Sequence, residues 1–195
     1  MDPHDIAGSR DRAFSAYHSL IRRSLDEHGS LDWLAGGAFP LSGPGPFPAP
    51  LLEQVALAEH CAEIQSLASL AKVHRLRLTL GAWWRATGIG VVPRLLLFDS
   101  GGQWQTLPPS EKSPFESVQL HMPASPGNSS SLAGLAARCR RQRRYGAWIE
   151  MMRGPAAPPG ACPAMSGGSA IVGPDGGLIA RASVSEESCL VAEVR

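Results

Sequence analysis

Four cysteines are the residues of this chain best suited to covalent chemistry, because a thiolate can attack the carbon of a carbonyl or nitrile group. They are Cys61, Cys139, Cys162 and Cys189, and no two of them form a CxxC pair. Cys139 stands among the arginines of 138–144, whose positive charge would favour its thiolate form. Its position in a helix is nevertheless typical of a solvated face. We interpret Cys162 as an exposed loop residue, and Cys61 and Cys189 as small buried residues.

The sequence lacks the residue spacings that are typical of metal-binding and dinucleotide-binding sites. The histidines lack the His-x-x-x-His pair with a nearby acid that is typical of zinc sites. They are His4, His18, His28, His60, His74 and His121. The segments Gly88-x-Gly90 and Gly101-Gly102 do not sit between a strand and a helix, as a dinucleotide-binding loop would, and we predict turns there. We therefore expect no metal site and no cofactor.

Composition favours one globular domain over residues 1–195. Hydrophobic residues make up 44% of the chain and charged residues 18%, with a formal net charge of +1. This charge gives no reason to expect nucleic acid or an anionic membrane as a partner, although the arginines of 138–144 form a local basic run. No apolar run is long enough to cross a bilayer. Residues 1–12 lack the apolar core of a signal peptide, so we expect a cytoplasmic location.

The elements that would position these residues follow from hydrophobic periodicity. Apolar spacings of three and four predict helices over 10–28, 51–74 and 132–144. Alternation with a period of two, or short apolar runs between turns, predicts strands. These strands are expected at 75–84, 91–98, 103–107, 118–122, 145–152, 169–172, 178–182 and 189–194, with a further short strand within 30–39. Helices and strands that alternate along the chain indicate the α/β class.

One segment is specific enough to suggest a family. Gly168-Ser169-Ala170-Ile171-Val172-Gly173-Pro174-Asp175-Gly176-Gly177-Leu178-Ile179-Ala180 resembles a signature of the nitrilase, or carbon-nitrogen hydrolase, superfamily. In that signature a strand that begins near a serine is turned by Asp-Pro-x-Gly, and the return strand ends in Leu-Ala. The helix, strand and hairpin of 67–104 are similar to that family as well. The resemblance implies a single α-β-β-α sandwich, with the predicted helices outside two sheets.

The family's catalytic residues can be sought one by one. Such enzymes attack an amide or nitrile with a cysteine thiolate, aided by a glutamate base and a lysine that stabilises the oxyanion. Phe39-Pro40-Leu41-Ser42-Gly43 resembles the loop that carries the glutamate, so Leu41 stands where the base would be. Lys112 matches the lysine, and Glu116 matches a second family glutamate. The segment with the nucleophilic cysteine is missing between Lys112 and 118–125, and the first strand is not found in 1–9.

Two functional hypotheses follow from this resemblance. In the favoured one, a sandwich that lacks some strands has lost catalysis and acts as a binding or assembly partner, in a homo-oligomer or with a full-length homologue. In the alternative, the chain is a residual amidase or nitrilase that cleaves a non-peptide carbon–nitrogen bond of a small amide or nitrile through Cys139 or Cys162. The first is favoured because Leu41 cannot replace a base and the covalent step needs a nucleophile.

Overall fold

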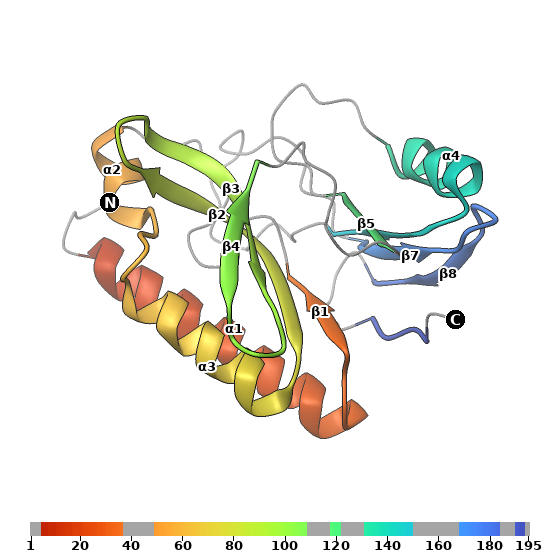
Figure 1. Ribbon diagram of the computed structural model, residues 1–195, viewed down its shortest axis with the longest axis horizontal. Coiled ribbons are helices and arrows are strands. Elements are labelled where there is room, and N and C mark those ends of the chain that lie inside the picture. The colour runs from red at the N-terminus through yellow and green to blue at the C-terminus, as the bar shows by residue number, and fades with distance from the viewer. Residues whose placement is uncertain are drawn as a thin grey trace. The chain divides into compact units, whose positions relative to one another are not determined.

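The computed structural model describes residues 5–36, 49–108, 118–121, 131–149, 168–183 and 190–193. The chain divides into two compact units, Met1–Pro109 and Ser110–Arg195. Each unit contains one four-stranded sheet. The predicted α/β class is confirmed by this combination of helices and two separate sheets (Figure 1).

The sheet of the first unit begins with a parallel pair and continues as an antiparallel meander. Its strands are β1 (Trp33–Ala35), β2 (Arg77–Ala86), β3 (Gly90–Phe98) and β4 (Trp104–Leu107), in the order β1-β2-β3-β4. β1 runs parallel to β2, whereas β2, β3 and β4 are antiparallel neighbours. Pro93 is tolerated inside β3, where it lies opposite Trp83. The predicted strands over 75–84, 91–98 and 103–107 are therefore confirmed.

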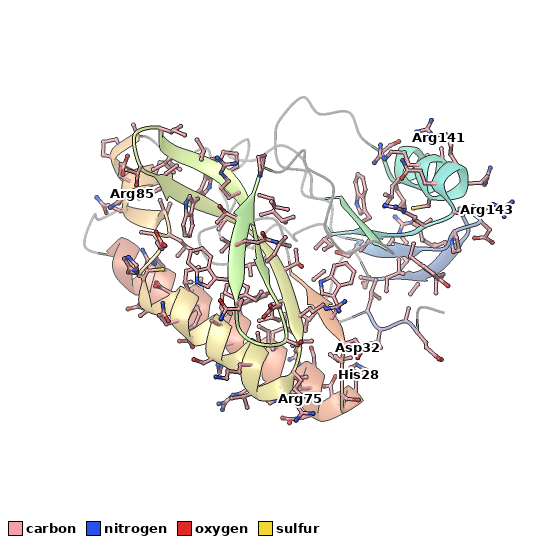
Figure 2. The ribbon with its side chains drawn as sticks, in the orientation of Figure 1. His28, Asp32, Arg75, Arg85, Arg141 and Arg143 are labelled. Carbon is pink, nitrogen blue, oxygen red and sulfur yellow. The ribbon has the colours of Figure 1, made fainter. Side chains whose placement is uncertain are left out.

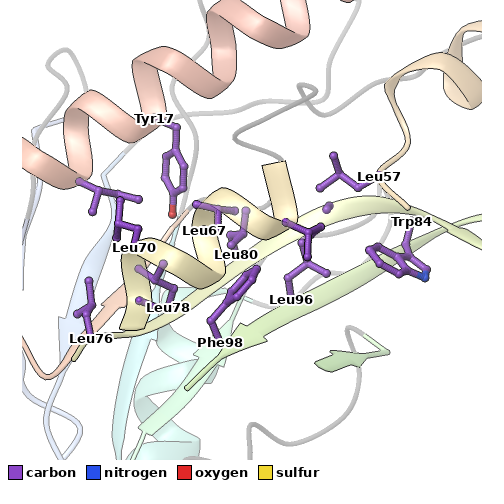
Figure 3. Close-up of a cluster of buried hydrophobic side chains, with 14 of the residues drawn as sticks. Tyr17, Leu57, Leu67, Leu70, Leu76, Leu78, Leu80, Trp84, Leu96 and Phe98 are labelled. Carbon is purple, nitrogen blue, oxygen red and sulfur yellow. The ribbon is translucent and has the colours of Figure 1, made fainter. Parts of the chain in front are cut away.

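Two long helices cover one face of this sheet. Helix α1 (Asp5–His28) and helix α3 (Ala62–His74) run side by side, and a short helix α2 (Ala49–Val55) precedes α3 (Figure 1). Tyr17 and Ile21 of α1 meet the apolar side of α3 and the alternating leucines of β2 in one buried cluster. Figure 3 shows this cluster, in which Tyr17 points toward the α3 side chains and Phe98 of β3 closes the sheet side.

The prediction of one continuous helix over 51–74 is wrong in the middle of that range. The chain leaves the helical path after Val55, and Leu57 forms a bridge with Trp84 of β2. The Leu57 amide donates to the Trp83 carbonyl at 2.8 Å, and the Arg85 amide donates to the Leu57 carbonyl at 2.8 Å. Leu57 is 1% exposed, so burial of this side chain and two sheet hydrogen bonds outweigh the helical propensity of the segment.

The second unit has one helix on a shorter sheet. Its elements are β5 (Val118–His121), α4 (Leu132–Gln142), β6 (Tyr145–Trp148), β7 (Ala170–Val172) and β8 (Leu178–Arg181). The strands follow the order β5-β6-β7-β8, with β5 parallel to β6 and the other neighbours antiparallel. Helix α4 contributes to a small core that is closed by one side chain of β6 and two of β7. Its members are Leu135, Cys139, Trp148, Ala170 and Val172.

The two units repeat one arrangement. In each, a strand is followed by helix (α2 and α3 in the first unit, α4 in the second), by a second strand parallel to the first, and by two antiparallel strands. The repeated helices also end alike, because Arg75 after α3 and Arg143 after α4 both adopt the left-handed conformation, with φ of 51° and 52°. The next amide then bonds back to the helix, from Leu76 to Ala71 at 2.9 Å and from Arg144 to Cys139 at 3.1 Å.

One predicted strand is not formed. Within the expected strand over 189–194, residues 190–193 are described and pair with no strand. Val191 is 44% exposed, so its apolar side chain gains little from burial at this place. A short apolar alternation needs a neighbouring ladder to become a strand, and sequence periodicity carries no information about that ladder. Among the described residues, no helix has the length and apolarity needed to cross a bilayer.

Candidate functional site

The family-derived site residues fall in segments beyond the described part of the chain. Leu41 lies in 37–48, and Lys112 and Glu116 lie in 109–117. Cys162 and Cys189 also lie outside the described residues. The structure does describe the strands that lead into these segments, because β1 ends just before 37–48 and β4 just before 109–117.

The end of β1 is held by a close contact at Gly36. Its amide donates to the Thr79 carbonyl at 2.6 Å and extends the β1–β2 pairing by one residue. The Trp33 indole nitrogen donates to the Thr79 hydroxyl at 2.9 Å. A Cβ atom on Gly36 would collide with the hydroxyl of Tyr17 on α1. The strand that leads to Leu41 is therefore fixed to both its neighbouring strand and the helix layer, a constraint that sequence reasoning missed.

The start of β4 is fixed by a tight turn at 99–103. The Asp99 carboxylate accepts hydrogen bonds from the amides of Gly101 and Gln103, each at 2.9 Å. Gly102 has φ of 81°, and a Cβ atom there would lie 2.7 Å from the Ala68 carbonyl oxygen of α3. Only glycine combines this φ with such an approach. The predicted glycine turn is confirmed, and it also docks the β3–β4 hairpin on α3, which the sequence did not predict.

Cys139 is a core residue, which corrects its interpretation as part of a solvated helix face. It is 0% exposed and packs with Leu135 against β6. A Cβ atom on Gly146 of β6 would lie 2.5 Å from its Sγ atom, so the strand passes directly over the thiol. Burial raises the pKa of the Cys139 thiol, and the charge of Arg138 offsets only part of that effect. A neutral, covered thiol cannot serve as the nucleophile of a hydrolase.

Cys61 lies at the N-cap of α3 instead of in the body of a helix. Its backbone is extended, with φ of −73° and ψ of 151°, and its side chain makes no capping hydrogen bond. The residue is half-buried and packs against the core of the first unit. The prediction that Cys61 is a small buried residue is therefore only partly confirmed, because the residue is partly exposed at the beginning of α3.

An ion pair that the sequence did not reveal joins α1 to the first turn of α3. The Arg10 guanidinium Nε donates to the Glu63 carboxylate at 2.5 Å, and both side chains are mostly buried. Burial alone would raise the pKa of Glu63, but the hydrogen bond and charge of Arg10, with a backbone hydrogen bond, lower it overall. The hydrogen bond that Arg10 donates to Glu63 raises the pKa of Arg10. The two residues are far apart in sequence, so no local pattern could predict the pair.

The described histidines and acids do not converge on a metal site. Within the described residues no group of three side chains from His, Cys, Asp or Glu is placed to hold a metal ion. The rings of His18 and Phe14 lie at a tilt, with their centroids 6.0 Å apart. The pKa of His18 is lowered by burial first, and then by the charges of Arg22 and His74. His18 is a half-buried residue of α1.

Sequence comparisons return nothing for this chain, whereas comparisons of structure return a consistent fold. No family model matches the sequence, and no curated protein sequence matches it. Nit3 of Saccharomyces cerevisiae, described as a member of branch 10 of the nitrilase superfamily, is similar with a TM-score of 0.71 and 15% identity. That similarity covers 92% of this chain and 82% of Nit3.

Two further structures agree with this result. XC1258 of Xanthomonas campestris, a CN-hydrolase superfamily protein with an arsenic adduct in its active site, matches with a TM-score of 0.63 and 15% identity, over 92% of this chain and 81% of that chain. An amidase from Nesterenkonia sp. matches with a TM-score of 0.57 and 18% identity, over 94% of this chain and 82% of that chain. The chain therefore has the α-β-β-α sandwich fold of the nitrilase superfamily.

Proposed function

We propose that this protein is a nitrilase-like chain that has lost catalysis and acts as a binding or assembly partner. The observation that carries the proposal is the burial of Cys139. It is the thiol with the most cationic sequence surroundings, yet it is 0% exposed and its pKa is raised by burial. The candidate that local charge favoured for covalent attack is thereby removed.

The sequence at the other catalytic positions supports the same proposal. By the resemblance of 39–43 to the family's loop, Leu41 stands where the glutamate base would be, and leucine has no group that can accept a proton. Between Lys112 and Leu132 the chain contains no cysteine at all. An oxyanion-stabilising lysine such as Lys112 accelerates nothing without a nucleophile and a base that act before it.

A direct assay separates this function from the residual amidase. The purified chain is incubated with a panel of small amides, nitriles and carbamoyl compounds, while an active amidase run in parallel sets the detection limit. We expect no turnover above the uncatalysed rate. Turnover that Cys162→Ser abolishes and Cys139→Ser leaves unchanged would overturn the proposal, since it would assign the nucleophile to Cys162.

The assembly role has its own test. Sedimentation of the purified chain at low micromolar concentration is expected to show a homo-oligomer, or a complex when a full-length homologue is added. The reason is that a sandwich that lacks strands exposes sheet edges and apolar surface. A single well-folded monomer that has a cooperative thermal transition and ignores the homologue would contradict this role.

A further inference from the structure

The C-terminal end of α4 concentrates positive charge in a way that the rest of the chain does not. Four arginines occur within 140–144, and no lysine accompanies them. We call Arg140, Arg141, Arg143 and Arg144 the α4 arginine end. The chain as a whole carries a net charge of only +1, so this cluster is a local feature of the second unit.

The structural repeat shows which of these charges the fold itself uses. Arg140 corresponds to Lys72 of α3, because each lies beside a positive-φ glycine of the neighbouring turn, Gly176 and Gly102. Arg140 also donates from Nε to the Asp175 carbonyl at 2.8 Å, which ties α4 to the β7–β8 turn. These contacts account for Arg140 by packing and turn geometry alone.

The left-handed C-cap positions explain a second pair of corresponding charges, one in each unit. Arg143 corresponds to Arg75, and each occupies the C-cap that follows its helix. A cation near a helix C-terminus is also favoured by the helix dipole. Both pairs thus have a structural explanation that holds in either unit.

Arg141 also lies in the last turn of α4, where the helix dipole favours a cation, but neither Arg141 nor Arg144 has a charged counterpart in the first unit. At the corresponding places the first unit has Val73 and the fully buried Leu76. The same backbone therefore forms without a charge at either position. The second unit instead carries two additional guanidinium groups, of which Arg141 is exposed and Arg144 half-buried.

Most of the α4 arginine end is exposed, since Arg140, Arg141 and Arg143 are exposed and Arg144 is half-buried. Figure 2 shows the side chains of Arg141 and Arg143 pointing outward from the end of α4. Among the described residues, no carboxylate forms an ion pair with Arg141, Arg143 or Arg144. Clustered guanidinium groups repel one another, and an external anion removes that cost.

We propose that the α4 arginine end binds an acidic segment of a partner protein, an inference that rests on the proposed binding role and specifies its partner. Guanidinium groups pair with carboxylates through two parallel hydrogen bonds, which suits a run of Asp and Glu. The cluster spans little more than one helical turn, about 5 Å of rise, which is short for a nucleic-acid backbone. Nucleic-acid-binding domains are usually strongly basic overall, whereas this chain has a pI near 7.8.

The test uses labelled probes and the full chain. Binding of a fluorescent oligo-glutamate peptide is followed by anisotropy, in parallel with an oligo-glutamine peptide and a single-stranded oligonucleotide. We expect the glutamate peptide to bind, to weaken as salt rises, and to lose about tenfold in affinity in the Arg141→Gln, Arg144→Gln double variant. The matched control, Arg22→Gln with Lys72→Gln, removes two exposed cations of the first unit and should change affinity less than about twofold.

Each other outcome counts against the proposal. Equal losses in the two double variants would show that net charge, and not the α4 arginine end, governs binding. Tighter binding of the oligonucleotide, or no binding of the glutamate peptide, would overturn the assignment of an acidic protein partner. Failure of the proposed loss of catalysis is measured separately, because it would be seen as turnover of the amide panel and not as a change in affinity for the glutamate peptide.

Discussion

The carbonyl oxygen of Ala136 lies 2.9 Å from the position that a Cβ atom on Gly176 would occupy. The same relationship recurs in the first unit, where the Ala68 carbonyl oxygen lies 2.7 Å from the Cβ position of Gly102. Both glycines have positive φ, and both sit in the turn before the last strand of their sheet. In each unit the turn can approach the helix backbone this closely because the glycine at that point has no side chain.

The first prediction tests these contacts. Gly176→Ala and Gly102→Ala should each destabilise the protein by about 2–4 kcal/mol, because each combines left-handed strain with a clash against helix backbone. Gly88→Ala is the matched control, since Gly88 has φ of 77° but nothing within 4 Å of its Cβ position. It should cost about 1 kcal/mol from strain alone. Urea unfolding followed by circular dichroism measures all three, and equal losses would show that the contacts with Ala136 and Ala68 are unimportant.

The second prediction tests the break between α2 and α3. Leu57→Ala should cost about 2–5 kcal/mol, because it empties a position that is 1% exposed and weakens the bridge to Trp84. The control is Leu178→Ala on β8, which removes a side chain that is 54% exposed and should stay within about 0.5 kcal/mol of the parent. Thermal unfolding of the parent and both variants measures the two changes in stability. Comparable stability of the two would mean that Leu57 is exposed on one continuous helix over 51–74, which is the helix that periodicity predicts.

Much of the fold could be predicted from the sequence, because local periodicity sets most elements. The alternation of leucines in 76–80 and the helical spacings of 10–28 and 132–144 correspond to β2, α1 and α4. The break at Leu57 could not be predicted, since its cause is a hydrogen-bonded bridge to a strand that lies far along the chain. The unpaired state of 190–193 has the same origin, because strand pairing depends on neighbours that periodicity does not describe.

The candidate site was predicted less well, and Cys139 shows why. Its arginine neighbours drew attention to thiol activation, but Leu132, Leu135 and Ala136 precede it at the spacing of one helix face. That spacing alone places Cys139 on the buried side of α4. The Arg10–Glu63 pair had no local signal of any kind. The residues Leu41, Lys112 and Glu116 rest on resemblance and stay predictions.

The third prediction concerns the Arg10–Glu63 pair and pH. Because the folded pKa of Glu63 is lowered, its contribution to stability is complete above its unfolded pKa of about 4.3 and is lost as pH falls through the folded value. Arg10→Gln should therefore cost about 1–3 kcal/mol near neutral pH. The difference between parent and variant should shrink below about pH 4.

Urea unfolding of the parent and the Arg10→Gln variant from neutral to acidic pH provides the measurement. The control is Arg23→Gln, which removes a cation from an exposed pair in which the Arg23 and Glu27 side chains are 54% and 56% exposed. It should change stability little at any pH. A constant difference between parent and Arg10→Gln across the whole range would mean that the charge of Glu63 does not contribute.

The last prediction concerns the two described thiols, which the structure places in opposite environments. Cys139 is covered by β6 and has a raised pKa, whereas Cys61 is half-buried at the beginning of α3. Iodoacetamide should therefore modify Cys61 at least about tenfold faster than Cys139 in the native protein, because alkylation requires an accessible thiolate. Peptide mapping by mass spectrometry reads each cysteine separately. In denaturant the two rates should converge, which controls for the neighbouring arginines of Cys139. Equal native rates, or faster modification of Cys139, would show that α4 does not bury this thiol, and the residual amidase would regain its candidate nucleophile.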